Sequence, residues 1–414
     1  MKLNELLPAG MDRLHGLDAV RGFALLLGVA LHATMSYLPG SQYWWIVSDS
    51  DPSMALSGLF YWVHMFRMPL FFLIAGFFAH LSFHRLGMKA FIKDRFKRIV
   101  IPLVSAWPMV FTGIILVVIW IALIKFNGTL PKESPPGPKF TPDDFPLTHL
   151  WFLYVLSLLY IVVLAVRTLL AKIDHKGHIR MALDAFMRLL MKPGASLLLA
   201  LPLATGLYYT PKWVMWFGIP TPDSSLYPNL AACLGFSVAF LVGWGLHRQI
   251  ALLQILKKYW SVNLLLAMVA TAASLSITGL SPMQLPVTDN DQKWMYAFTY
   301  SVGAWSWPLA LVGMGLRFLS NVSPKRRYLA DSSYWVYIVH LPIVMALQVA
   351  TSLVNWPWWV EYPLMLTTGF ALMLGSYQLF VRHTFIGASL NGRKIPKASK
   401  DKKQNRDISV PVGE

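Results

Sequence analysis

The sequence is poor in charged residues. Asp, Glu, Lys and Arg make up 13% of its 414 residues, whereas hydrophobic residues make up 56%. Soluble domains carry about 25% charged residues, so this scarcity excludes an ordinary water-soluble protein. Acidic residues are especially few, with 19 Asp and Glu against 36 Lys and Arg and a formal net charge of +17. The composition predicts an integral membrane protein with an excess of positive charge.

Cysteine is almost absent. The single cysteine, Cys233, lies inside an apolar run, which excludes an intramolecular disulfide and a cysteine-based metal cluster. We interpret Cys233 as a small packing residue. The 11 histidines are scattered over several apolar segments without the spacing of metal ligands, so the sequence predicts no bound metal.

Long apolar runs, in contrast, dominate the chain. A helix needs about 20 apolar residues to cross a bilayer, and ten segments meet this length approximately: 17–38, 61–82, 100–124, 149–167, 194–210, 226–246, 261–280, 295–316, 332–352 and 362–381. The first is too long for the apolar part of a cleaved signal peptide. We predict an all-α, polytopic membrane protein with about ten transmembrane helices.

The positive charges are distributed unevenly between the two sides of the membrane that the predicted helices define. If both termini are cytoplasmic, 29 of the 36 Lys and Arg residues fall on the cytoplasmic side and five on the other, as the positive-inside rule requires. The charge therefore needs no nucleic-acid partner. The chain divides into a cytoplasmic N-terminal segment at 1–16, a membrane domain at 17–382, and a basic cytoplasmic tail at 383–414 that we predict to be disordered.

The first apolar segment contains two side chains that can be cationic, Arg21 and His32. Residues eleven apart on an α-helix differ by about 20° in azimuth and by ~16 Å along the axis, so both lie on one face. Arg21 can be a surface anchor beside Asp18, and His32 can be a structural core histidine. Ionisable residues inside a membrane are functional candidates, and neutral His32 is suited to be a general base.

Further candidates lie in other segments. His64 and Arg67 are three residues apart in the second segment, and Arg67 either anchors the helix at the outer surface or lines a cavity. His149 and His340 each stand alone in a later segment, where a structural role is the more common one.

A basic stretch follows the second segment. Arg95 and Arg98 are spaced three apart with Lys97 between them. Arginine binds phosphate through two parallel hydrogen bonds. A basic stretch at this place can equally be topology-determining charge or a lipid-binding loop.

Five stretches together resemble acyltransferase family 3, a family of multi-pass membrane proteins. They are LDAVRGFALLLGVALH (17–32), FRMPLFFLIAGFF (66–78), RFKRIVIP (95–102), HLWFLYVL (149–156) and YWVYIVHLP (334–342). The resemblance implies transfer of an acyl group from a cytoplasmic acyl-CoA to an extracytoplasmic acceptor, usually a carbohydrate hydroxyl. Within the family, the chain looks most like the glucans biosynthesis protein C branch, which is associated with succinyl substitution of osmoregulated periplasmic glucans.

The resemblance also implies roles for individual residues. Arg21 and His32 match the family's essential pair in the first helix, and Arg95 and Arg98 match the Arg-x-x-Arg pair linked to the donor. His340 matches a recurrent histidine of a late helix. Ala75 is a departure, because many members have Ser at this position.

We therefore expect an O-acyltransferase of the bacterial inner membrane. Succinyl-CoA or acetyl-CoA would be the co-substrate and no metal would be needed. A glycan, the lipid bilayer and other glucan-synthesis proteins are the expected partners. The alternative is a proton-coupled transporter or flippase of glycans, although the chain shows no internal repeat of the kind that builds many transporters.

The spacing suggests a mechanism. Arg95, Arg98 and Lys97 would hold the CoA phosphates, and the pantetheine arm would pass Arg21 to reach His32, the general base. Arg67 would bind a succinyl carboxylate or the thioester oxyanion. The substrate-binding set is completed by His64, His149 and His340. Direct transfer and an acyl-enzyme relay both remain open. Both require that the Arg21–His32 stripe faces an interior tunnel.

Overall fold

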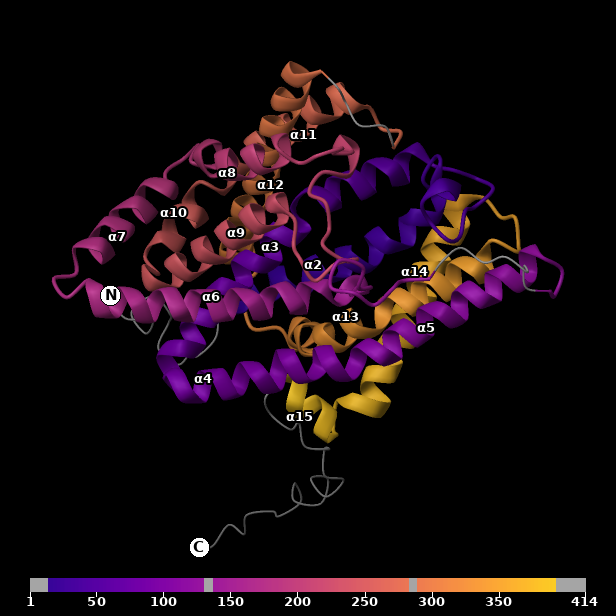
Figure 1. The fold of residues 1–414 in the computed structure, drawn as a ribbon, viewed down its shortest axis with the longest axis horizontal. Helices are drawn as coiled ribbons and strands as arrows, with labels where there is room; N and C mark the ends of the chain where they lie inside the picture. The colour runs from indigo at the N-terminus through magenta and orange to yellow at the C-terminus, as the bar shows by residue number, and fades with distance from the viewer. Residues whose placement is uncertain (1–13, 130–136, 283–288, 392–414) are drawn as a thin grey trace, which may run out of the picture.

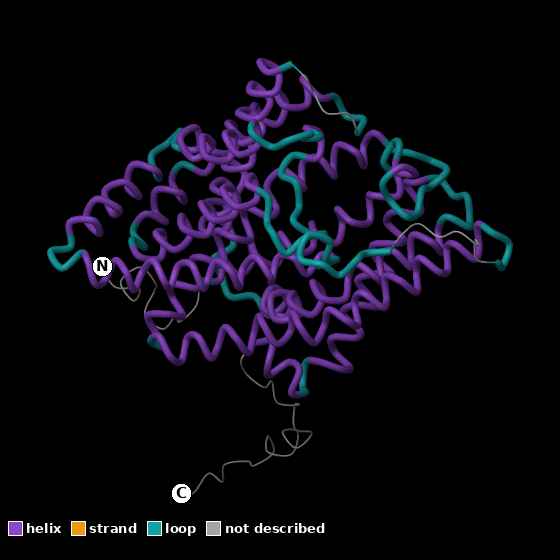
Figure 2. The backbone as a smooth tube through the Cα atoms, in the orientation of Figure 1, coloured by secondary structure: helices purple, strands orange, loops and turns teal. Residues whose placement is uncertain are grey.

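The computed structural model describes residues 14–129, 137–282 and 289–391. Within these residues the chain is helix and loop, and no strand occurs apart from an isolated bridge between Thr141 and Asp144 (Figure 2). The all-α prediction is thereby confirmed. Most of the predicted N-terminal segment at 1–16 and most of the predicted tail at 383–414 lie outside the described residues.

All ten predicted segments are helical. Among the described residues, eight helical stretches could cross a bilayer by length and composition: His15–Tyr37, Met54–Leu86, Met88–Lys125, Thr148–Ile173, Leu230–Arg248, Trp260–Thr278, Pro324–Thr351 and Trp358–Val381. The segment predicted at 194–210 forms α8 (Ser196–Tyr208), which has only 13 residues. The segment predicted at 295–316 lies in α12 (Asn290–Phe318), which is not among the eight. Helix α12 packs against several other helices, and most of its residues from Tyr296 to Gly315 are buried, so much of its surface faces protein.

The helices that matter most for the site are four long ones. They are α2 (His15–Thr34), α3 (Met54–Leu86), α6 (Trp151–Ile173) and α13 (Pro324–Thr351) (Figure 1). Helix α3 continues through Pro69 for 33 residues. The remaining elements named below are α7 (His178–Leu190), α9 (Leu230–Arg248), α11 (Trp260–Thr278) and α14 (Trp358–Ser376).

One long rod borders the molecule. It consists of α4 (Met88–Arg95), the π-helical turn η3 (Phe96–Val100) and α5 (Ile101–Lys125), and it runs along the lower edge of Figure 1 with α6 above it. A π-helical turn shifts the register of a helix and is frequent at functional sites. Here it carries Arg98 and directly follows Arg95.

Helices α3 and α9 pack with their backbones in contact. A Cβ atom added to Gly76 would lie 1.9 Å from the carbonyl oxygen of Phe240, and one added to Gly243 would lie 1.8 Å from that of Leu73. Only glycine fits at both places, and small residues of this kind let membrane helices approach closely. The glycine pair therefore fixes how α3, a wall of the site, is placed.

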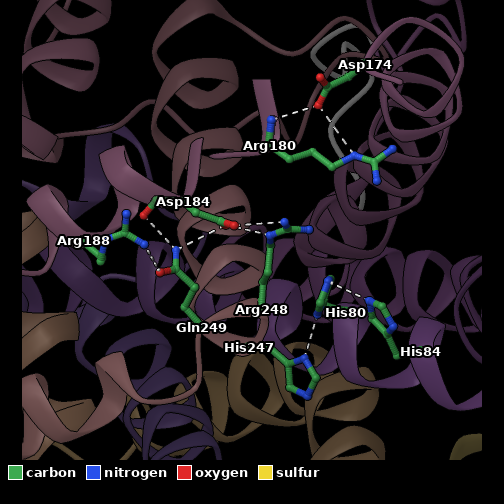
Figure 3. A network of polar contacts seen from close by, with 9 residues as sticks. All are labelled: His80, His84, Asp174, Arg180, Asp184, Arg188, His247, Arg248 and Gln249. Atoms are coloured by element: carbon green, nitrogen blue, oxygen red, sulfur yellow. Dashed lines mark hydrogen bonds and ion pairs between the residues drawn. The ribbon is translucent and has the colours of Figure 1, made fainter. Parts of the chain in front are cut away.

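Polar contacts join the last turn of α9 to the last turns of α3 and to the middle of α7 (Figure 3). The Nδ1 atom of His80 is 2.7 Å from Nδ1 of His247, and its Nε2 atom is 3.1 Å from Nε2 of His84. Arg248 donates two hydrogen bonds to the Asp184 carboxylate, at 2.7 and 3.0 Å. Because His80 meets its two partners through different nitrogens, the three imidazoles form a chain and do not converge on one point.

The start of the predicted tail is ordered, which corrects the expectation of disorder for that part. Residues Phe385–Asn391 form a short helix, α15. Leu390 is 7% exposed. A Cβ atom on Gly387 would lie 2.3 Å from the carbonyl oxygen of Val381. Burial of an apolar side chain and close backbone contact hold this segment in place.

Candidate active site

A cavity of ≈1010 Å³ runs through the helical bundle. Side chains from α2, α3, α6 and α13 line it, together with Arg95 and Arg98 from the rod. We call the part lined by Arg21, Arg95 and Arg98 the arginine end. We call the part lined by the imidazoles of His32, His64, His149 and His340 the histidine end.

Helical periodicity explains how the single helix α2 contributes side chains to both ends of the cavity. Apart from Val29 and Leu31, the lining residues of α2 and its two caps recur every three or four positions: Leu14, Asp18, Arg21, Leu25, Gly28, His32 and Met35. This spacing marks a single face of a helix. Arg21 and His32 thus lie on one stripe of α2, and that stripe faces the cavity as the sequence predicts.

At the arginine end, Arg21 is held by three contacts. Its Nη2 atom lies 3.2 Å from Oδ1 of Asp18 and 3.5 Å from the carbonyl oxygen of Ala330, and its guanidinium carbon lies 5.6 Å from the ring centroid of Phe78. The Asp18 partner is the one expected from the sequence. Its contacts hold the guanidinium at the wall of the cavity.

Arg95 and Arg98 share one carboxylate. Arg95 Nη2 lies 2.6 Å and Arg98 Nε lies 2.9 Å from the two oxygens of Asp94. Two guanidinium groups thus meet one carboxylate, which leaves this end with a surplus of positive charge. Lys97 is exposed and does not line the cavity, so the structure does not bring it together with the two arginines.

Three imidazoles lie in series at the histidine end. The ring centroids of His32 and His340 are 5.1 Å apart, and those of His340 and His149 are 4.7 Å apart. His64 lies at the same end and stacks on Phe60 at 5.2 Å. Histidines from four separate helical segments thus meet at one end of the cavity. The sequence predicted each of them as a candidate but could not predict that they lie together.

Backbone carbonyls determine the tautomers of two of these imidazoles. Nδ1 of His340 donates to the carbonyl oxygen of Tyr337 at 2.7 Å, and Nε2 of His149 donates to that of Ile338 at 3.0 Å. A carbonyl oxygen only accepts, so the bonded nitrogen carries the proton. In the neutral rings, Nε2 of His340 and Nδ1 of His149 are therefore left as hydrogen-bond acceptors.

The His32 ring has a weaker local partner. Its Nδ1 atom lies 3.3 Å from the sulfur of Met35. A thioether sulfur accepts weakly, so this contact favours a proton on Nδ1 and leaves Nε2 as the basic nitrogen. His32 also lies in the last turn of α2, so the position of its ring depends on how the end of that helix is held.

Arg67 lacks an acidic partner. Its Nη1 atom donates to the carbonyl oxygen of Gly28 at 3.2 Å, its Nε atom is buried without a hydrogen bond, and no carboxylate of residues 14–129, 137–282 or 289–391 forms an ion pair with it. A Cβ atom on Gly28 would lie 3.0 Å from Nη1. Gly28 therefore makes room for a guanidinium that has no carboxylate partner among the described residues.

Gln348 connects the end of α2 to an outer loop. Its Nε2 atom donates to the carbonyl oxygen of His32 at 2.9 Å, and its Oε1 atom accepts from Nε1 of Trp45 at 3.0 Å. The backbone N–H of Met35 donates to the same carbonyl oxygen. Gln348 therefore adds a second hydrogen bond at the end of α2 and helps to hold His32.

Sequence reasoning missed several lining residues. Tyr334 and Tyr337 lie six and three positions before His340 and line the cavity, so helical spacing could have identified them. Trp44 and Trp45 line it from a loop, where no periodicity points to them. Gln348 could not be identified either, because its partners lie more than 300 residues away.

Eight of the nine predicted site residues line this cavity, and Lys97 is the exception. Their proposed roles remain predictions. Cationic side chains at one end suit a polyanion, and neutral imidazoles at the other suit proton transfer. A cavity of this kind inside a helical membrane protein suits an enzyme that carries a group from one end to the other.

Comparison with known proteins agrees with this class. A family model described as an acyltransferase domain matches residues 14–377, and the chain belongs to this acyltransferase 3 family.

Curated relatives match part of the chain. Glucans biosynthesis protein C of Escherichia coli (strain SMS-3-5 / SECEC) is 34% identical over 154 residues, which is 36% of this chain and 37% of that protein. The proteins of the same name from Escherichia coli O1:K1 / APEC and O9:H4 (strain HS) are 33% identical over 154 residues with the same coverage. The match spans well under half the length of these relatives. No solved structure matches the chain significantly.

Proposed function

We propose that the protein is a membrane O-acyltransferase that moves a short acyl group from acyl-CoA to a hydroxyl of a glycan on the opposite side of the membrane. One observation carries the proposal: a single cavity joins a cluster of arginines to a cluster of imidazoles in a chain of the acyltransferase 3 family.

The donor would enter at the arginine end. Arg95 and Arg98 would bind the CoA phosphates from the cytoplasm, in keeping with the distribution of positive charge. The pantetheine arm would lie along the stripe of α2. Eleven helical residues, from Arg21 to His32, span ~16 Å, which is comparable to that arm. Lys97 would contribute only at the exposed entrance.

His32 would act as the general base. Its Nε2 atom takes the proton of an acceptor hydroxyl while the hydroxyl oxygen attacks the thioester carbonyl carbon. An ester bond forms, the carbon–sulfur bond breaks, and the imidazolium returns the proton to the CoA sulfur. General-base catalysis of this kind contributes ~10²–10⁴ in rate.

Arg67 supports succinyl as the acyl group. A partly buried guanidinium without a protein carboxylate is costly unless an anion pairs with it. The terminal carboxylate of a succinyl group would be such an anion, whereas an acetyl group has none. Arg67 would otherwise stabilise the oxyanion formed at the thioester.

The name of the relatives, glucans biosynthesis protein C, supports a glucan as the acceptor. In this proposal the glucan is periplasmic and the protein lies in the inner membrane of a bacterium. Other proteins of glucan synthesis would then be partners.

The test uses purified protein in lipid nanodiscs. Succinyl-CoA or acetyl-CoA is supplied with a β-glucan oligosaccharide, and free thiol and product mass are measured. We expect thiol release that depends on the glucan, a product heavier by one acyl group, and loss of both in His32→Ala. Glucan transport into vesicles without thiol release would instead favour the transporter.

A second measurement separates the two chemical routes. Donor labelled in its acyl group is added without acceptor, and the protein is analysed for covalent label. Direct transfer leaves the protein unlabelled. Label that is absent from His32→Ala would establish an acyl-enzyme relay through that residue.

A further inference from the structure

Two neighbouring residues in η4 (Thr148–Leu150), the 3₁₀ turn that directly precedes α6, carry polar atoms without partners among the described residues. Oγ1 of Thr148 and Nδ1 of His149 are both buried, and neither has a hydrogen bond in the described parts of the chain. Both residues line the cavity. Buried polar atoms of native proteins are rarely left unpaired, so a pair of them at one cavity wall points to a ligand.

A proline in another helix explains why Nδ1 is the unpaired nitrogen of His149. The carbonyl of residue 338 in a regular helix accepts from the N–H of residue 342, but residue 342 is Pro342, which has no N–H. The carbonyl oxygen of Ile338 accepts from Nε2 of His149 instead, at 3.0 Å. Pro342 thereby leaves a carbonyl that holds the His149 proton on Nε2.

Thr148 has an unusual backbone conformation. Its φ is 54°, in the left-handed region that β-branched residues rarely adopt. Its N–H donates to the carbonyl oxygen of Asp223 at 3.1 Å, which ties η4 to the loop that contains Phe217. Glycine would adopt this conformation without strain, and strained backbone conformations often lie at functional sites, so the Thr148 hydroxyl is a candidate contact for a ligand.

We propose that Oγ1 of Thr148 and Nδ1 of His149 bind hydroxyl groups of the acceptor, and that Pro342 is a positioning residue that determines which nitrogen of His149 is presented. The inference rests on the proposed function and names the acceptor-binding atoms of that site. Nδ1 offers a lone pair and Oγ1 can donate or accept. This pair suits a neutral polyol such as a sugar and does not suit a carboxylate or phosphate, which brings no donor for Nδ1.

Two amide substitutions at position 149 test which nitrogen is used. Asn carries its polar atoms near the position of Nδ1, whereas Gln carries them near that of Nε2. We expect His149→Gln to raise the KM for the glucan oligosaccharide about tenfold, as for the loss of a buried hydrogen bond, and His149→Asn to raise it less than threefold. Equal effects, or the reverse order, would overturn the proposal.

Substitutions at position 148 separate binding from folding. Thr148→Gly removes the hydroxyl and the left-handed strain together, so the melting temperature should stay or rise while the acceptor KM increases several-fold. Thr148→Ser keeps the hydroxyl and should leave the acceptor KM within twofold. If Thr148→Gly binds the acceptor as tightly as the wild type, the hydroxyl has no such role.

Pro342 is tested through its coupling to His149. Pro342→Ala restores an N–H that can bond the Ile338 carbonyl, so it should raise the acceptor KM in the wild type. The same change should have no further effect in His149→Gln, because residues that act through one another are not additive. Additive effects in the double variant would show that Pro342 acts elsewhere.

Direct binding keeps this inference separate from the proposed function. Titration of the oligosaccharide into protein without acyl-CoA measures acceptor affinity without turnover. Absence of thiol release together with the His149→Gln defect in binding would refute the acyl transfer alone. Thiol release together with equal affinities of wild type and His149→Gln would refute this inference alone.

Discussion

Single residues decide the chemistry that the cavity can carry out, and Arg67 is the clearest case. Its guanidinium meets only the Gly28 carbonyl among the described residues, and its Nε atom is buried without a partner. A structural arginine would be expected to pair with a carboxylate, as Arg95 and Arg98 do with Asp94. This difference supports different roles for the two groups in our proposal: Arg95 and Arg98 would bind the donor phosphates, and Arg67, which lines the same cavity, would bind the acyl group.

Arg67→Gln should alter the choice of acyl group. The change removes the positive charge while it keeps a polar side chain of moderate length. Hydrogen bonds to charged groups contribute about 1.5–3 kcal/mol, so kcat/KM for succinyl-CoA should fall at least about tenfold relative to that for acetyl-CoA. Competition between the two donors in one reaction measures this ratio.

The control for Arg67 is a variant that moves the guanidinium without removing it. Gly28→Ala places a methyl group 3.0 Å from Nη1 of Arg67, so the selectivity should weaken in the same direction but by less. Equal losses for both donors in Arg67→Gln would instead assign Arg67 to the thioester oxyanion, which the two donors share.

At the scale of elements, hydrophobic periodicity predicted most of what the structure contains. The stripe of α2 was predictable because Arg21 and His32 stand eleven residues apart, and the helix keeps that face inward. The loop that bears Trp44 has no such period. Helix α15 was not predictable either, because its packing depends on the close approach of Gly387 to the Val381 backbone, which no sequence pattern reveals.

The contact between α3 and α9 should tolerate no side chain at its centre. Gly243→Ala would place a Cβ atom 1.8 Å from the Leu73 carbonyl oxygen. Overpacking of this kind costs about 1–3 kcal/mol, and here backbone has to move. We expect a clearly lower melting temperature in detergent by a fluorescence-based unfolding assay.

A second glycine provides the matched control. A Cβ atom on Gly375 of α14 would meet nothing within 4 Å. Alanine is preferred over glycine inside helices by roughly 0.5–1 kcal/mol, so Gly375→Ala should leave the melting temperature unchanged or raise it. A similar loss in both variants would mean that close packing at Gly243 is not the cause.

The start of α7 should contribute stability that depends on pH. Burial opposes ionisation of Asp174, but the backbone N–H groups of Arg180 and Ile179 and the Arg180 guanidinium outweigh it and lower the pKa of this carboxyl (Figure 3). A lowered pKa in the folded state gives stability that is present above the unfolded value and is lost as pH falls through the folded value. Asp174→Asn should thus melt lower than wild type at neutral pH.

The pH series tests the sign of this effect. The difference in melting temperature between wild type and Asp174→Asn should be constant from about pH 8 to pH 5, because the unfolded carboxyl titrates near 3.9. It should shrink at lower pH, where the wild-type carboxyl becomes neutral as well. A difference that grows on acidification would contradict the assignment.

At the scale of the whole molecule, the sequence identified most side chains of the site but not their convergence. His32, His149 and His340 lie in three different helices, and their spacing of about 5 Å between neighbouring rings depends on helix packing that single-helix periodicity cannot give. The tautomers depend on more distant features, such as a carbonyl that Pro342 leaves free. Lys97 shows the converse: a basic residue between two cavity arginines faces outward, because consecutive helical positions point in different directions.

The continuity of the cavity gives the last prediction. Ala75 lines the cavity on α3, eight residues after Arg67 and ten before Arg85. Along the helix axis it therefore lies about 12 Å from Arg67 and about 15 Å from Arg85. Ala75→Trp should therefore block the path between the two ends. We expect acyl transfer to fall at least about a hundredfold, because a donor misplaced by an ångström already loses about that much, while CoA still binds at the arginine end.

Leu116→Trp on α5, whose side chain is 61% exposed, is the control of equal size and should remain active. Full activity in Ala75→Trp would show that the acyl group does not travel through this cavity, and the two ends would then have to serve separate purposes.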